Sequence, residues 1–123
     1  TDYPRGVTAG VIGELAPKIR RLSLLGVNDV IVDPGFGFSK TVSQNYRLLR
    51  DLEAFSMLGR PVLVGLSRKS MLTKALGISA DEALEATTAA NTLAIERGAA
   101  ILRVHDVAAA RQAVDVSTFL HTV

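Results

Sequence analysis

The chain has 123 residues, of which 48% are hydrophobic and 21% are charged, as is typical of one soluble globular domain. The formal net charge is +2 and aromatic residues make up 5%, which argues against a nucleic-acid-binding surface. The absence of cysteine, of a signal peptide and of an apolar run near the roughly 20 residues of a membrane span favours a cytoplasmic protein away from membranes.

Helical patterns recur along the chain and are expected over residues 7–25, 42–58, 71–76, 79–97 and 107–116. Pro17 interrupts the first pattern and predicts a kink or a restart there. The second helix is expected to be capped by Thr41 or Ser43. Ser79 and Glu82 have the spacing of a capping box, and Gly26, Gly59, Gly77 and Gly98 are placed as helix ends.

Three short apolar runs alternate with these helices and predict strands over 30–32, 61–66 and 100–104. The run Val30-Ile31-Val32 is continuously β-branched, as expected of a parallel strand covered on both faces. Consecutive strand–helix units indicate a parallel sheet with right-handed crossovers. The predicted fold class is α/β, with one domain over residues 1–123.

An unusual polar cluster follows each predicted strand: DPGFGF at 33–38, GLSRKS at 65–70 and RVHD at 103–106. In parallel α/β sheets the carboxyl ends of the strands carry the functional site. The three clusters are therefore expected to meet in one site.

The first cluster combines a carboxylate with two glycines and two phenylalanines. Asp33 is predicted either to accept hydrogen bonds from a ligand ring or act as a general base, or to cap the following loop. Gly37 allows the backbone to approach a ligand. Phe36 and Phe38 are expected either to lie on a flat ring or to pack into the core.

In the second cluster, Arg68 and Lys69 are expected to point in opposite directions because side chains alternate along an extended segment. Ser70 precedes a short helix whose first N–H groups favour a negative group. Lys69 could instead be a Schiff-base lysine, which would require a lowered pKa.

In the third cluster, Arg103 and His105 lie two residues apart and hence on one face of the strand, where they could form an anion site. The alternative is an Arg103–Asp106 ion pair with His105 in the core; Asp106 could also cap the last helix. Together the clusters suit a flat, hydrogen-bonding ring attached to a phosphate or pyrophosphate.

Four stretches resemble bacterial dihydropteroate synthases: DPGFGFSK at 33–40, QNYRLLRDL at 44–52, PVLVGLSRKSM at 61–71 and RVHDV at 103–107. The resemblance implies the C-terminal half of a TIM (β/α)8 barrel, with three parallel strands, flanking helices and the first half missing. It implies condensation of 6-hydroxymethyl-7,8-dihydropterin pyrophosphate with p-aminobenzoate, which releases pyrophosphate and makes this family a sulfonamide target. Ser39 replaces a glycine common in the family's loop.

The resemblance also implies roles for individual residues. Asp33 and Lys69 would be catalytic: Asp33 would hold the pterin and stabilise its cation, and Lys69 would contact the pterin ring and line the aminobenzoate pocket. Arg103 and His105 would hold the departing pyrophosphate. The remaining implied contacts are Gly37 and Phe38 in the aminobenzoate pocket, Ser70 on its carboxylate, Ser67 as a wall residue and Arg68 on the structural side.

Magnesium is implied only through the pyrophosphate and residues outside this chain, so no metal ligand is expected here. The intact enzyme is expected to be a homodimer, and this chain alone to be inactive. The alternatives are a methyltetrahydrofolate methyltransferase-like barrel, a non-catalytic half barrel that oligomerises, and a Schiff-base aldolase using Lys69.

Overall fold

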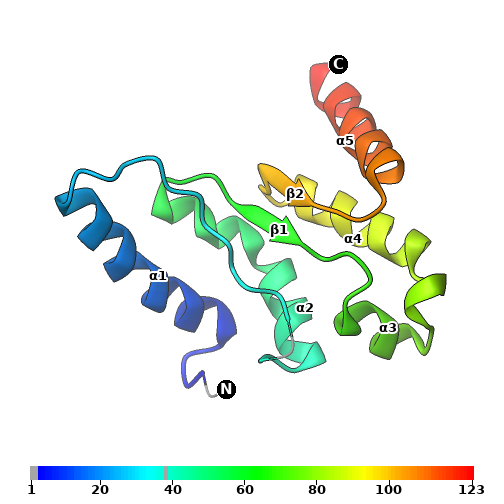
Figure 1. Ribbon diagram of the computed structural model, residues 1–123, viewed down its shortest axis with the longest axis horizontal. Helices are drawn as coiled ribbons and strands as arrows, with labels where there is room; N and C mark the ends of the chain where they lie inside the picture. Colours follow the sequence, from blue (N-terminus) through cyan, green and yellow to red (C-terminus); the bar gives the residue numbers. More distant parts are fainter. Residues whose placement is uncertain (1–2, 38) are drawn as a thin grey trace.

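The computed structural model describes residues 3–37 and 39–123 (Figure 1). The elements in chain order are α1 (Val7–Leu24), α2 (Val42–Arg50), the 3-10 helix η1 (Leu52–Leu58), β1 (Leu63–Gly65), α3 (Ser70–Leu76), the 3-10 helix η2 (Ala80–Glu82), α4 (Leu84–Glu96), β2 (Ile101–Arg103) and α5 (Val107–Thr122). The two strands lie between α1 and α2 at one end and α4 and α5 at the other (Figure 1). None of the described helices is long and apolar enough to cross a lipid bilayer.

Most predicted helix ends are confirmed by their capping geometry. The Thr41 side chain accepts a hydrogen bond from the Gln44 amide and completes a capping box. Gly59 and Gly77 end their helices in the left-handed region, each with φ 65°. By contrast, α1 continues through Pro17 without interruption, and α5 extends beyond the predicted end to Thr122.

Two helices predicted as continuous are each divided in the structure. The pattern over 42–58 becomes α2 followed by η1, because Leu52, Phe55 and Leu58 are spaced by three residues. A 3-10 helix has three residues per turn and places them above one another on the core side, where Leu52 is 1% and Phe55 0% exposed. The Ser79–Glu82 capping box is present, but it begins η2, and α4 starts separately at Leu84.

The prediction of three strands is wrong for residues 30–32, which form a single parallel bridge between Val32 and Val62. The bridge is made by the Val32 amide donating to the Pro61 carbonyl at 2.8 Å and the Leu63 amide donating to the Val32 carbonyl at 2.7 Å. Extending the ladder in either direction would require an N–H from Pro61 or from Pro34. Proline has none, so the pairing stops after one residue.

The two-stranded sheet is parallel, with Leu63 opposite Ile101 and Gly65 opposite Arg103. One face is packed into the core, where Val64 and Leu66 are both 0% exposed. The opposite face is open: Ile101 is 36% and Ile31 is 55% exposed. The prediction that residues 30–32 are covered on both faces is therefore wrong.

The C-terminal helix is joined to α4 by a polar cluster. One carboxylate oxygen of Glu96 accepts a hydrogen bond from the Ser117 hydroxyl at 2.7 Å. The same oxygen lies 2.9 Å from Nε2 of His121. The hydrogen bond from Ser117, followed by the contact with His121, lowers the pKa of Glu96. His121, for which no role was predicted from the sequence, therefore helps to hold α5 in place.

This cluster predicts an acid-dependent loss of stability. Because the pKa of Glu96 is lower in the folded than in the unfolded chain, its contribution is complete above the unfolded value of about 4.3 and is lost as the pH falls through the folded value. In chemical denaturation at a series of pH values, Glu96→Gln should therefore lose less stability on acidification than the unmodified chain. Glu14→Gln, which alters an exposed carboxylate of α1, should not have this effect; equal acid sensitivity of both variants would contradict the prediction.

Candidate functional site

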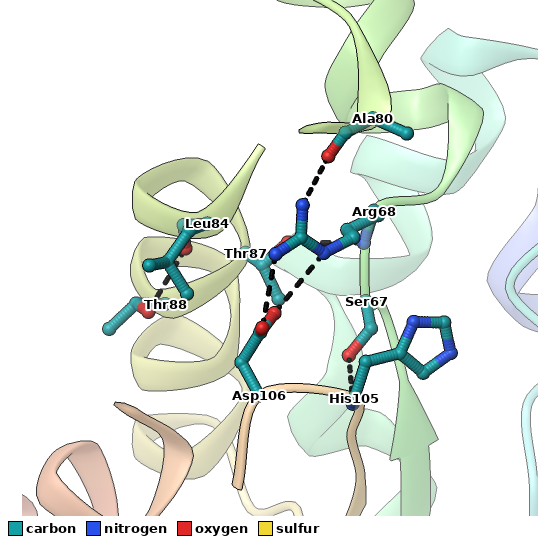
Figure 2. Close-up of polar contacts among 8 residues, drawn as sticks. All are labelled: Ser67, Arg68, Ala80, Leu84, Thr87, Thr88, His105 and Asp106. Atoms are coloured by element: carbon teal, nitrogen blue, oxygen red, sulfur yellow. Dashed lines mark hydrogen bonds and ion pairs between the residues drawn. The ribbon is translucent and has the colours of Figure 1, made fainter. Parts of the chain in front are cut away.

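The loop after β1 sends its consecutive side chains in different directions. The Ser67 hydroxyl accepts a hydrogen bond from the His105 amide at 3.1 Å. Arg68 turns to Asp106 (Figure 2), whereas the Lys69 ammonium donates to the Phe36 carbonyl at 2.6 Å. The predicted opposite orientation of Arg68 and Lys69 is confirmed.

The loop that contains Asp33 is held in a turn. The Asp33 carboxylate accepts a hydrogen bond from the Gly35 amide at 2.9 Å, and Gly35 has φ 79°, a value that favours glycine. The predicted loop cap is thus present, while the carboxylate remains exposed at the surface. Phe36 is 4% exposed and packs in the core; Phe38 lies outside the described residues.

Two residues that the sequence interpretation missed position the same loop. Asn45 is 2% exposed; its amide nitrogen donates to the Gly37 carbonyl at 3.0 Å, and its amide oxygen accepts from the Gly37 N–H at 3.2 Å. The Lys40 ammonium donates to the Gly35 carbonyl at 2.6 Å. A signal for Asn45 exists in the sequence, because it shares a helical stripe with Leu48 and Leu49, where a polar residue needs a buried partner.

The electrostatics of Lys69 show which charges surround it. Burial is the main cause that lowers the pKa of its ammonium group, followed by the positive charge of Arg103, with a smaller contribution from Lys40. Asp33 acts in the opposite direction and raises this pKa. Lys69 is therefore close enough to Arg103 and to Asp33, which were predicted from the two other clusters, for their charges to act on it. A lowered pKa also suits a Schiff-base lysine, but here the ammonium group is engaged as a donor to a carbonyl oxygen.

Arg103 lies over a glycine of the neighbouring strand. Gly65 is its partner in the strand register, and a Cβ atom at Gly65 would lie 3.0 Å from both Nε and Nη2 of Arg103. Gly65 thus leaves the space in which the guanidinium group lies, a second role that the sequence interpretation missed. Paired residues in parallel strands face the same side of the sheet, so Arg103 occupies the face left open by the helices.

The alternative of an Arg103–Asp106 ion pair with His105 in the core is wrong, because Asp106 pairs with Arg68. Asp106 is the N-cap residue of α5, as predicted, but its side chain makes no capping hydrogen bond. His105 is exposed rather than buried in the core. In Figure 2 its imidazole and the Asp106 carboxylate point to different sides of the backbone, so the ring is available to a ligand.

A cavity of about 560 Å³ opens between the first and second clusters. The described residues that line it are Gly35, Phe36, Gly37, Ser39, Arg68, Lys69 and Ser70. Of the predicted aminobenzoate contacts, Gly37, Lys69 and Ser70 thus share one cavity. Arg103 ends β2 and His105 follows it, at the same end of the sheet but beyond this lining. Within the described residues, no group of three or more His, Asp or Glu side chains could hold a metal ion.

Residues 2–105 match the family model of pterin binding enzymes. The chain therefore belongs to the pterin binding enzyme family.

Its relatives include dihydropteroate synthases from several bacteria. The chain is 41% identical over 109 residues to the enzyme of Haemophilus influenzae, an alignment that covers 87% of this chain and 40% of that protein. Crystal structures of dihydropteroate synthase from Thermus thermophilus, one with 4-aminobenzoate and one with 6HMPPP, each match with TM-score 0.91 and 41% identity. They cover 98% of this chain and 49% and 48% of the matched chains. The chain thus spans about half the length of these relatives, or less.

Proposed function

We propose that this chain supplies the pterin-pyrophosphate- and aminobenzoate-binding half of a dihydropteroate synthase. The observation that carries the proposal is the grouping of Asp33, Lys69 and Arg103 at the carboxyl ends of adjacent parallel segments, since Val32 is bridged to Val62 and Gly65 lies opposite Arg103. A carboxylate suits the N–H groups of a pterin ring, and an exposed guanidinium suits a pyrophosphate. The Thermus thermophilus relative, crystallised with 6HMPPP and with 4-aminobenzoate, supports the same ligand classes.

The reaction would form a C–N bond between the amine of aminobenzoate and the pterin methylene carbon, while the bond from that carbon to the pyrophosphate oxygen breaks. Pyrophosphate would leave with the electron pair and the amine would lose a proton. The negative charge of Asp33 would stabilise the cationic pterin, and Arg103 with His105 would hold the negative charge that develops on the leaving group. Lys69 would contact the pterin beside the cavity that takes aminobenzoate.

Two wider parts of the proposal concern the complete enzyme. The open sheet face with Ile31 and Ile101 is what the interior of a (β/α)8 barrel would cover, which supports a partial barrel. We also propose that the complete enzyme is a cytoplasmic homodimer. Magnesium does not fit the described residues of this chain, since the groups that follow β1 and β2 are mainly cationic, and no step is assigned to it. We expect the 123-residue chain alone to bind weakly and to form no dihydropteroate.

Asp33→Asn tests the pterin assignment. It keeps the side-chain shape but removes the negative charge, so binding of the pterin pyrophosphate should weaken by about tenfold or more, since hydrogen bonds to a charged group contribute about 1.5–3 kcal/mol. Affinity can be measured by NMR titration of the chain. Asp29→Asn, which changes an exposed carboxylate before the bridge, is the matched control and should leave the affinity unaltered. Equal affinities for both variants would argue against the pterin site.

A further inference from the structure

Arg68 has a backbone conformation that is unfavourable for its residue type. Among the described residues it is the one non-glycine with positive φ, at 55°. Such conformations persist where surrounding contacts determine them. Here the Arg68 amide donates to the hydroxyl of Thr87 at 3.1 Å, and Thr87 is 2% exposed. The buried face of α4 therefore holds the loop after β1 in this shape.

Arg68 belongs to the lining of the cavity, and its guanidinium group is held by Asp106 and by the Ala80 carbonyl. Nε donates to one Asp106 oxygen at 3.2 Å and Nη2 to the other at 3.0 Å, which is the two-pronged arrangement of a strong ion pair. Nη1 donates to the Ala80 carbonyl of η2. Figure 2 shows all three contacts radiating from one guanidinium group. One side chain thus ties the loop after β1 to η2 and to the start of α5.

This pair adjoins a second link between the same two loops. The amide of His105, the residue before Asp106, donates a hydrogen bond to the hydroxyl of Ser67, the residue before Arg68. Two consecutive residues of each loop are thereby fixed to each other. The residues assigned to ligand binding lie on either side of these links: Lys69 immediately follows Arg68, and Arg103 and His105 precede Asp106.

We propose that the Arg68–Asp106 ion pair is a positioning clamp that sets the separation between Lys69 and the Arg103–His105 group. The clamp holds a ring-binding residue and an anion-binding group at a fixed spacing, so that a ligand carrying a ring and a pyrophosphate is bound at both ends at once. Joining two ligand parts increases affinity only when the geometry allows both to bind together. The identity of the ligand rests on the proposed function; the clamp between the loops does not.

The first experiment needs no ligand. Hydrogen exchange of the His105 amide, followed by NMR, reports whether the two loops stay together. Arg68→Gly removes the side chain while its backbone favours φ 55°, and Asp106→Asn removes only the charge. Both variants should speed exchange of this amide by roughly tenfold, with little change at amides in the core of α2.

Arg111→Gln is the matched control, because Arg111 also pairs with an aspartate, Asp115, at 2.9 Å. That pair lies on the exposed surface of α5, with Arg111 70% exposed against 24% for Arg68. Arg111→Gln should leave the hydrogen-exchange rate of the His105 amide unchanged. Unchanged exchange in Arg68→Gly and Asp106→Asn would overturn the clamp, whatever any ligand does.

The second experiment compares 6-hydroxymethyl-7,8-dihydropterin, pyrophosphate and the joined pterin pyrophosphate. With the clamp removed, the affinity for each separate part should change less than about twofold, while that for the joined ligand should fall about tenfold. Equal losses for all three ligands would indicate a general structural role and overturn the clamp. If the unmodified chain does not bind the joined ligand although hydrogen exchange responds as expected, the proposed function fails and the clamp stands.

Discussion

Replacing Asn45 by alanine is expected to lower the free energy of unfolding by about 2–6 kcal/mol, since it leaves two Gly37 backbone groups without partners, at about 1–3 kcal/mol each. The same change should loosen the loop that carries Asp33 and weaken binding of the pterin pyrophosphate. Urea denaturation and NMR titration measure the two effects. Ser43→Ala, an exposed position of the same helix, should alter neither quantity.

Asn45→Asp provides a test with a distinct pH signature. Aspartate keeps the oxygen that accepts from the Gly37 amide, but an ionised carboxylate cannot donate to the Gly37 carbonyl. Burial should raise the pKa of the new carboxyl group above its unfolded value, so the folded state binds more protons and stability should increase as the pH falls. If Asn45→Asp instead has the same stability as the unmodified chain at pH 7, the paired hydrogen bonds to Gly37 do not contribute as described.

The sequence predicted the helix ends well, because they depend on local chemistry. The Thr41 capping box and the left-handed glycines at 59 and 77 need only their neighbours in the chain to form. The strand over 30–32 was overestimated, because its pairing depends on a partner segment. Pro34 and Pro61 remove the two N–H groups that would extend it, a limit that becomes visible only once the two segments are aligned.

In the candidate site, too, features set by local sequence could be predicted and features set by distant partners could not. Its place at the strand ends, and the opposite directions of Arg68 and Lys69, follow from parallel topology and side-chain alternation. The partner of Arg68 could not be predicted, because Asp106 is 38 residues away in the sequence. The role of Gly65 depends on its register with Arg103, which strand prediction does not provide.

Arg103→Gln is expected to weaken binding of pyrophosphate by about 10- to 100-fold, because a hydrogen bond to a charged group contributes about 1.5–3 kcal/mol. The same change should raise the pKa of the Lys69 ammonium, since the positive charge of Arg103 is the second cause that lowers it. NMR titration with pyrophosphate measures the affinity, and the pH dependence of the Lys69 Cε resonance measures the pKa. Arg111→Gln also removes one positive charge, and it should change neither the affinity for pyrophosphate nor the pKa of Lys69.

Two further variants separate charge from geometry at this position. Arg103→Lys keeps the positive charge but loses the planar fork that grips a phosphate group at two points, so it should restore the lowered pKa of Lys69 more fully than the affinity for pyrophosphate. Gly65→Ala keeps every charge and places a Cβ atom 3.0 Å from the guanidinium, which must then move away from the strand. Its affinity should lie between those of the unmodified chain and Arg103→Gln. Full affinity in Gly65→Ala would show that pyrophosphate does not require the guanidinium over Gly65. The anion site would then be assigned to His105.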